Sequence, residues 1–267
     1  MIVRDAIAAG SFYPGSLPDL KSYLDDVMGS KENKISPIAI MVPHAGYIYS
    51  GAVAAKVYSR LESYDTYIIL GPNHTGLGAA ISVFEGEFNM PYGAVKTDDE
   101  AVDYITANSS AEIDAYAHIN EHSIEVQLPF IDYISPHGYK VVPIVIGTLD
   151  SKRLSQLGHT ISSFIKHSHK NILIVVSSDM NHYENEETTL KKDRMAIEKI
   201  EQLDEDDLLN TTERFNISMC GIACAYTAIV ASKDLGAKKA ELIEHRTSGE
   251  VNGDYDHVVG YAAIIIE

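Results

Sequence analysis

Three histidines of this sequence, His44, His74 and His182, each follow a short apolar run, and Asp179 lies just before the last of them. Neutral imidazole is the commonest ligand that side chains offer to iron, copper and zinc, and a carboxylate compensates the charge of a divalent ion. Taken singly, each histidine is better explained as a turn residue or a buried polar group. Together they predict one site of the metal-binding type.

A fourth polar segment, residues 118–127, precedes an apolar stretch and contains His122. Its imidazole is an acid/base candidate, because a histidine pKa near neutrality permits proton transfer at physiological pH. The local alternative is that Ser123 caps a helix while Glu125 favours its first turn. The residues alone leave both interpretations open.

Signatures of other enzyme classes are absent from the sequence. It has no G-x-x-x-x-G-K-[ST] phosphate loop, no G-x-S-x-G elbow and no G-x-G-x-x-G dinucleotide motif. Ser177 and Ser178 stand close to Asp179 and His182, but nearness in sequence does not make a catalytic triad. We therefore disfavour a serine hydrolase.

The elements that must position these residues follow from hydrophobic patterning. Short β-rich runs alternate with longer amphipathic stretches, which favours crossover connections, and several strand runs are apolar throughout. We expect one α/β domain over residues 1–267, with a largely parallel or mixed central sheet and helices on both faces. The carboxyl ends of neighbouring strands would then bring the histidine loops together. Strands are predicted at residues 38–42, 67–70, 80–84, 141–146, 172–177, 240–245 and 258–266, and helices at 18–28, 50–61, 98–107, 123–133, 151–167, 188–202 and 220–232.

Composition limits the partners and the compartment. The formal net charge of −17 disfavours nucleic acid and anionic membranes. The two cysteines, Cys220 and Cys224, are predicted to share one helix face as small core residues, which fits a reducing, cytoplasmic setting. Neither a signal-like start nor an apolar run of membrane-spanning length occurs, so no membrane association is expected.

Several motifs resemble one known family, the MEMO family, also called the AmmeMemoRadiSam system protein B family. They span nearly the whole chain in the family's order, at residues 9–13, 43–47, 50–51, 71–74, 121–125, 127–129, 177–182, 220–221 and 260–263. The resemblance implies a fold similar to class III extradiol dioxygenases of the LigB type, which use non-haem iron. It also implies that His44 and His74 are metal ligands and that Asp179 and His182 line the same pocket.

The same resemblance raises the question of a third ligand. The animal member of the family has a cysteine ligand, which we place in the C-terminal loop at the position of Val251. Because valine cannot bind a metal, we expect the neighbouring Glu250 to serve instead. His44, His74 and Glu250 would form a two-histidine, one-carboxylate set, which suits non-haem Fe(II).

Two functions follow as expectations. The first is a metal-dependent redox or oxygenase-like enzyme that uses Fe(II), with copper or zinc as alternatives. In it, His182 and His122 would move protons, and Asp179 would orient one of them. The second is a non-catalytic module that binds a peptide, a small molecule or a partner protein in a dioxygenase-like pocket that is empty on isolation. Zinc-dependent hydrolysis is a third, weaker alternative. Microbial members of the family also suggest a functional link to a radical-SAM protein.

Overall fold

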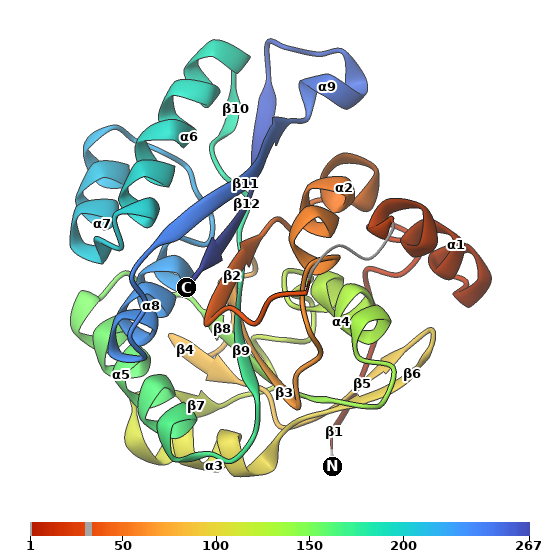
Figure 1. Ribbon diagram of the computed structural model, residues 1–267, viewed down its shortest axis with the longest axis vertical. Coiled ribbons are helices and arrows are strands. Elements are labelled where there is room, and N and C mark those ends of the chain that lie inside the picture. Colours follow the sequence, from red (N-terminus) through yellow and green to blue (C-terminus); the bar gives the residue numbers. More distant parts are fainter. Residues whose placement is uncertain (1, 30–33) are drawn as a thin grey trace.

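A computed structural model describes residues 2–29 and 34–267. Its centre is a nine-stranded sheet with the order β10-β12-β2-β9-β3-β8-β4-β7, in which β11 also pairs with β12 (Figure 1). A smaller three-stranded sheet has the order β1-β5-β6. The strands are β1 (Ile2–Asp5), β2 (Ala39–Val42), β3 (Thr66–Pro72), β4 (Ile81–Val83), β5 (Gly86–Met90), β6 (Gly93–Lys96), β7 (Glu112–Ile113), β8 (Lys140–Ile146), β9 (Ile172–Ser177), β10 (His182–Glu184), β11 (Ala240–Thr247) and β12 (Val258–Ile266).

Helices join and cover these strands. A 3-10 turn, η1 (Glu125–Gln127), leads directly into α4. The helices are α1 (Leu17–Met28), α2 (Tyr47–Tyr58), α3 (Asp99–Asn108), α4 (Leu128–Ile134), α5 (Ser151–His167), α6 (Glu186–Glu201), α7 (Glu205–Arg214), α8 (Ile222–Asp234) and α9 (Gly249–Asn252).

The central sheet is mixed, as predicted. Its middle strands β2, β9, β3 and β8 run parallel to one another, whereas β12 pairs antiparallel with β2 and β11, and β4 pairs antiparallel with β8. Because β2 and β3 both lie next to β9, the chain leaves these three strands at one edge of the sheet. The loops that carry His44, His74 and Asp179 therefore start side by side.

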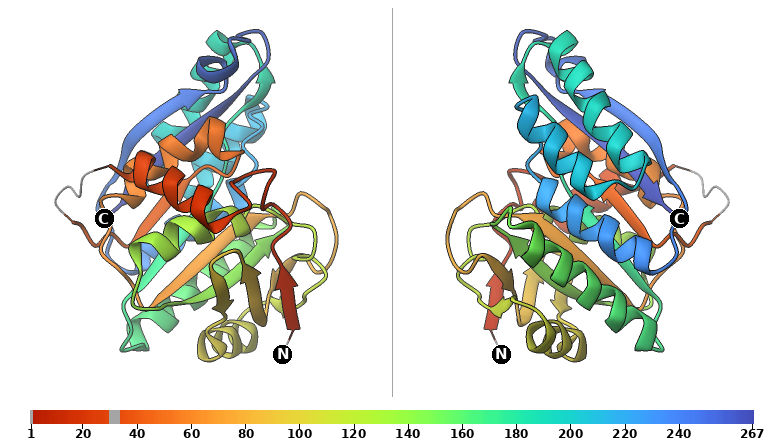
Figure 2. Two further views of the ribbon diagram at one scale, coloured as in Figure 1. Left: turned by 90° about the vertical axis from the view of Figure 1, so that its right-hand side faces the viewer. Right: turned by 90° about the vertical axis from the view of Figure 1, so that its left-hand side faces the viewer.

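Helices cover both faces of the sheet, which confirms the second part of the predicted architecture. In Figure 2, α1, α2 and α4 lie on one face, and α5, α6 and α8 lie on the other. Alternate residues of β3 enter the two cores: Ile68 and Leu70 pack into one, Tyr67 and Ile69 into the other. A strand that is buried on both faces needs apolar side chains at every position, which explains the continuous apolar runs.

Two local expectations fail. Ser123 does not cap a helix: its hydroxyl donates to the Pro72 carbonyl, and the helical segment begins at Glu125 without a side-chain cap. Cys220 and Cys224 do not share one helix, since α8 begins at Ile222. The small sheet and α9 lie outside the predicted elements, because their strands and turns are short or polar.

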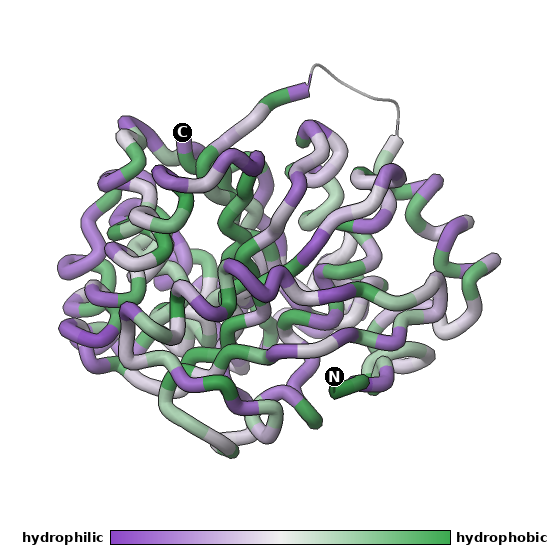
Figure 3. Tube along the Cα trace, turned by 90° about the horizontal axis from the view of Figure 1, so that it is seen from below, coloured by the Kyte–Doolittle hydropathy of each residue, from purple (hydrophilic) through white to green (hydrophobic). Residues whose placement is uncertain are grey.

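Hydropathy follows the layered arrangement. The hydrophobic stretches of the chain run through the interior, and hydrophilic stretches gather toward the outside (Figure 3). None of the helices within the described parts of the chain has the length and apolar character needed to cross a membrane.

Candidate metal centre

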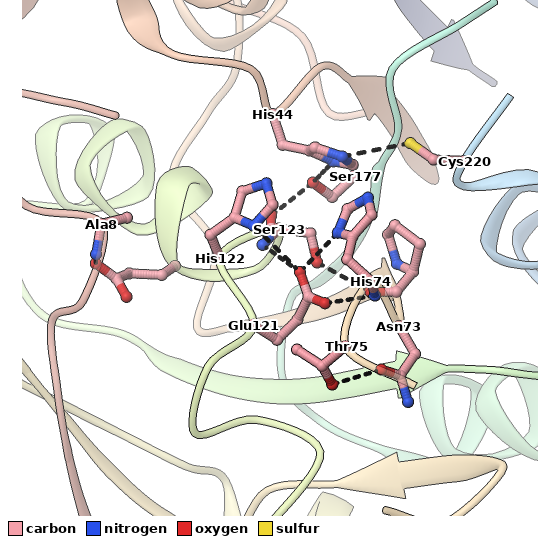
Figure 4. Close-up of polar contacts among 12 residues, drawn as sticks. Ala8, His44, Asn73, His74, Thr75, Glu121, His122, Ser123, Ser177 and Cys220 are labelled. Atoms are coloured by element: carbon pink, nitrogen blue, oxygen red, sulfur yellow. Dashed lines mark hydrogen bonds and ion pairs between the residues drawn. The ribbon is translucent and has the colours of Figure 1, made fainter. Parts of the chain in front are cut away.

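Three imidazoles meet beyond the carboxyl ends of the central strands. His44 follows β2, His74 follows β3, and His122 lies just before η1 (Figure 4). One ring nitrogen from each histidine can be chosen so that all three lie within 4.8 Å of one another. The ring centroids are 4.9–5.5 Å apart. These side chains form the group of possible metal ligands among residues 2–29 and 34–267.

The tautomer of His44 follows from its hydrogen bonds. Its Nδ1 lies 2.9 Å from the hydroxyl oxygen of Ser177, and that hydroxyl donates its single proton to the Ser123 carbonyl at 2.6 Å. The Ser177 oxygen must therefore accept from His44, so Nδ1 carries the hydrogen and Nε2 keeps its lone pair. Burial also lowers the pKa of His44 to about 4, although the Asp179 carboxylate opposes this shift. His44 is thus a neutral imidazole with Nε2 available to a metal.

Glu121 does for His74 what Ser177 does for His44. Its buried carboxylate lies 2.9 Å from Nδ1 of His74 and also accepts the backbone N–H groups of His74 and Ser123, at 2.7 and 2.9 Å. Burial works against the charge, yet these donors keep the pKa of Glu121 below its usual value. The ionised carboxylate accepts from Nδ1, so the neutral His74 ring has its lone pair on Nε2. Burial lowers the pKa of His74, but Glu121 outweighs burial and the pKa lies above its ordinary value. A carboxylate behind a histidine is the usual partner of a metal-binding imidazole.

The loop around His74 has its own support. The Asn73 side-chain oxygen accepts from the Thr75 hydroxyl and from the Gly76 N–H, which closes a tight turn. Gly76 has φ +67°, a conformation that glycine adopts without strain. The local sequence therefore fixes the direction in which His74 leaves β3.

His122 completes the group from the segment before η1. Its ring stacks on His74 at 4.9 Å between centroids and packs against Phe12 at 4.4 Å. Its Nδ1 is 3.6 Å from the Glu121 carboxylate. Burial lowers the pKa of His122, with the nearby Glu121 charge acting in the opposite direction. The residue predicted as an acid/base group thus lies where a third ligand would be.

Two further groups surround His44. Asp179 accepts the backbone N–H of His44 at 2.8 Å, and its second oxygen is 4.0 Å from Nε2 of that histidine. The Cys220 thiol lies 3.3 Å from the same nitrogen. A Cβ on the next residue, Gly221, would come within 2.4 Å of the Ser178 side chain. Only glycine lets the Cys220 segment approach this closely.

Cys220 corrects two expectations. It lies beside His44 rather than in the core with Cys224, and the cysteine next to the histidines thus comes from the segment before α8, not from the C-terminal loop. Burial, reinforced by Asp179, raises the pKa of its thiol, so the thiol is protonated at neutral pH in the metal-free protein. Gly221 beside it was the signal in the sequence, since a glycine after a polar residue often marks close packing.

Glu250 does not join the histidines. It lies on α9, where its side chain is 47% exposed, accepts the Thr247 N–H at 3.4 Å and lies 3.9 Å from the Arg246 guanidinium. The reason is the length of β12: Ile264 pairs with Met41 near the end of β2, so the part of β12 before Ile264 runs on past the site. The loop that carries Glu250 and the exposed Val251 is thereby held beyond the cluster (Figure 1).

His182 lies on the Asp179 loop but outside the histidine group. Its Nδ1 is 2.9 Å from the Ser218 carbonyl, and its N–H donates to the Ser218 hydroxyl. Since a carbonyl only accepts, Nδ1 carries the hydrogen and Nε2 can take a proton. These bonds also tie the Asp179 loop to the segment that carries Cys220.

Comparisons with known proteins identify the family. The model of the family described as Memo-like protein matches residues 4–265. A MEMO1 family protein of Aquifex aeolicus is 41% identical over 267 residues, with 99% of each chain covered. A second, from Desulfurococcus amylolyticus, is 44% identical over 280 residues, with 98% of each covered. The chain belongs to the Memo family.

A solved structure shares the fold. An uncharacterized protein from Escherichia coli K12 matches with a TM-score of 0.56 and 8% identity, covering 85% of this chain and 98% of that one. At this identity the likeness extends to the mixed α/β architecture alone.

The donor set fits a transition-metal ion. Neutral imidazoles suit iron, copper and zinc, and two of the three have their orientation fixed by a second hydrogen bond. A thiol and a carboxylate stand next to His44 as further donors. The arrangement therefore differs from the expected two-histidine, one-carboxylate set.

Proposed function

We propose that the site binds one transition-metal ion through His44, His74 and His122, and that the protein carries out metal-dependent redox or oxygenase-like chemistry. The observation that carries this proposal is the pairing of Nδ1 in both His44 and His74 with a buried partner. Such pairing selects the tautomer that offers Nε2 to a metal.

Fe(II) is the metal that we propose first, because of the resemblance to the non-haem-iron dioxygenases, with copper and zinc as alternatives. Three protein ligands leave coordination positions for a substrate or a small oxidant, which is the chemistry that a bound redox metal would supply. The nearby Cys220 thiol increases the fit to copper or zinc, because thiolate is a soft ligand.

The remaining pocket residues have roles that do not require binding the metal. Asp179 holds the backbone of His44 in place through its carboxylate. His182, whose Nδ1 is held by the Ser218 carbonyl, is the group that we assign to take a proton from a bound substrate through Nε2. His122, which we expected to act as an acid/base group, is proposed as a metal ligand instead.

Anaerobic titration of the metal-free protein tests this function. Fe(II), Co(II), Cu(I) and Zn(II) are added separately, and binding is measured by calorimetry and absorption. We expect one metal per chain and at least a hundredfold weaker binding in a His44→Ala, His74→Ala variant. His159→Ala is the matched control, because that exposed histidine pairs with Asp234 on another surface. Equal metal uptake by the double variant and the control would refute the proposal.

A non-catalytic binding module is the second candidate. Ile48 and Tyr183 are 73% and 74% exposed, next in sequence to the His44 loop and to His182. Tyr183 also has φ +61°, an uncommon conformation for a bulky residue that often marks a functional position. If a peptide or protein ligand is found, unchanged affinity after removal of His44 and His74 would favour this candidate.

A further inference from the structure

Arg4 joins the N-terminal strand to the segment that carries His122. Its guanidinium is buried, and it donates to the carbonyls of His118 and Glu121, at 2.6 Å each. A third bond of 2.7 Å reaches the Glu125 carboxylate. One side chain from β1 thus forms hydrogen bonds with residues before and after His122.

Glu125, which follows His122 in the chain, also binds the N-terminal segment. Its carboxylate is fully buried and accepts four donors, all from the first residues of the chain. Besides Arg4, these are the N–H of Ile7 at 3.0 Å, the N–H of Ala8 at 2.9 Å and the hydroxyl of Tyr13 at 2.8 Å. Ala8 lies on the His122 side of the cluster in Figure 4. Glu125 is therefore buried by its contacts with the N-terminal residues and not by a role in its own helical turn.

The segment between these anchors reaches two of the three histidine loops. The Phe12 ring packs against His122 at 4.4 Å between centroids. The Phe12 carbonyl accepts the N–H of Tyr47 at 2.7 Å, just after the loop of His44. Residues 4–13 therefore contact both the His122 ring and the segment that follows His44.

From these contacts we propose that residues 4–13 form a wall of the metal pocket, with Arg4 and Glu125 as positioning residues that set the place of His122. This inference rests on the proposed function. Neither residue would touch the metal. Arg4 and Glu125 instead hold the backbone from which His122 and Glu121 project, and Glu121 in turn orients His74.

Metal affinity gives the first test. Glu125→Gln keeps one acceptor oxygen but turns an amide toward the donors Arg4 and Ile7, and Arg4→Met removes the charge from the other side. We expect Co(II) to bind about tenfold more weakly to either variant, as for other residues that support ligands. The double variant, Arg4→Met with Glu125→Gln, leaves no unpaired buried charge and covers the case in which a single variant does not fold.

The matched control is Lys170→Met. It removes a partner of the buried Asp98, which also binds Thr66 at the opposite end of β3 from His74. Co(II) affinity and the Co(II) absorption spectrum should be unchanged there. A double variant with the affinity and spectrum of the unmodified protein would overturn the proposal.

A second test needs no metal. The chain contains no tryptophan, so Phe12→Trp introduces a single tryptophan next to His122, whose emission can be excited apart from that of the tyrosines. Adding Glu125→Gln should shift its emission to longer wavelength and increase quenching by acrylamide, whereas adding Lys170→Met should not. Unchanged emission would overturn the proposal. If the parent protein binds no metal, the proposed function fails, and this measurement still decides whether Glu125 positions the wall.

Discussion

At the scale of single residues, the site is defined more by the partners of the histidines than by the histidines. His44 and His74 have the same task, and different neighbours, Ser177 and Glu121, accept from their Nδ1 atoms. The Ser177 hydroxyl already donates its hydrogen to the Ser123 carbonyl, and the Glu121 carboxylate is ionised. Each of these groups can therefore only accept a hydrogen bond from Nδ1. In the neutral ring of each histidine the lone pair is then on Nε2, although one acceptor is a hydroxyl and the other a carboxylate.

Glu121→Gln tests this at one residue. A glutamine amide can keep its oxygen on His74 Nδ1 and the Ser123 N–H, but its NH₂ group then faces the backbone N–H of His74, and it lacks the charge that favours the Nδ1–H tautomer. We expect metal affinity to fall by about tenfold to a hundredfold. Calorimetric titration with Co(II) measures the change.

Glu100→Gln serves as the control for that substitution, because Glu100 is largely exposed and pairs with Lys170. It should bind Co(II) as the unmodified protein does. Equal affinity in both variants would show that Glu121 does not support His74.

At the scale of elements, strand length decides which loops share the pocket. β2, β3 and β9 end at one edge, whereas β12 continues beyond β2 and carries Glu250 away. On the opposite face, α5 packs directly on α8, the helix that follows Cys220. A Cβ at Gly158 of α5 would come within 2.8 Å of the Thr227 carbonyl and the Val230 side chain.

Gly158→Ala should therefore force the two helices apart. We expect the free energy of unfolding to fall by about 1–3 kcal/mol, the usual cost of overpacking, despite the better helix propensity of alanine. Urea unfolding followed by circular dichroism measures it. Lys152→Ala, at an exposed position of the same helix, should change stability by less than about 0.5 kcal/mol. Equal or greater stability of Gly158→Ala would contradict close packing here.

At the scale of the whole molecule, pH should affect stability through buried histidine. Burial lowers the pKa of His118 from 6.5 to about 4, and its Nε2 lies 3.0 Å from the Ser82 carbonyl. The unfolded chain binds this proton at a higher pH than the folded one. The contribution of neutral His118 is therefore complete above pH 6.5 and is lost as the pH falls toward 4.

The free energy of unfolding of the metal-free protein should thus decrease over that interval, by up to about 1.4 kcal/mol per pH unit for each such histidine. Denaturant unfolding at several pH values provides the measurement. His118→Gln should reduce the slope, because it removes one titrating group. A slope that is identical in this variant would mean that His118 does not titrate with unfolding.

Where signals are local, sequence and structure agree closely. Residues 151–167 and 172–177 are helix and strand with the predicted bounds, since an amphipathic period and an apolar β-branched run are each complete within the segment. The loops with His44 and His74 follow from the ends of such strands. Short polar strands such as β5 and β6 have no comparable signal, because pairing rather than composition makes them strands.

The sequence by itself therefore determined the layered α/β architecture, the family motifs and the histidines that follow β2 and β3. Only the tertiary structure decided which third residue stands beside them. His122 and Cys220 come from segments far from His44 in the chain, and Glu250 is excluded by how far β12 extends. Hydrophobic periodicity specifies elements, but the meeting of loops depends on strand order, register and length. These arise only when the sheet is assembled.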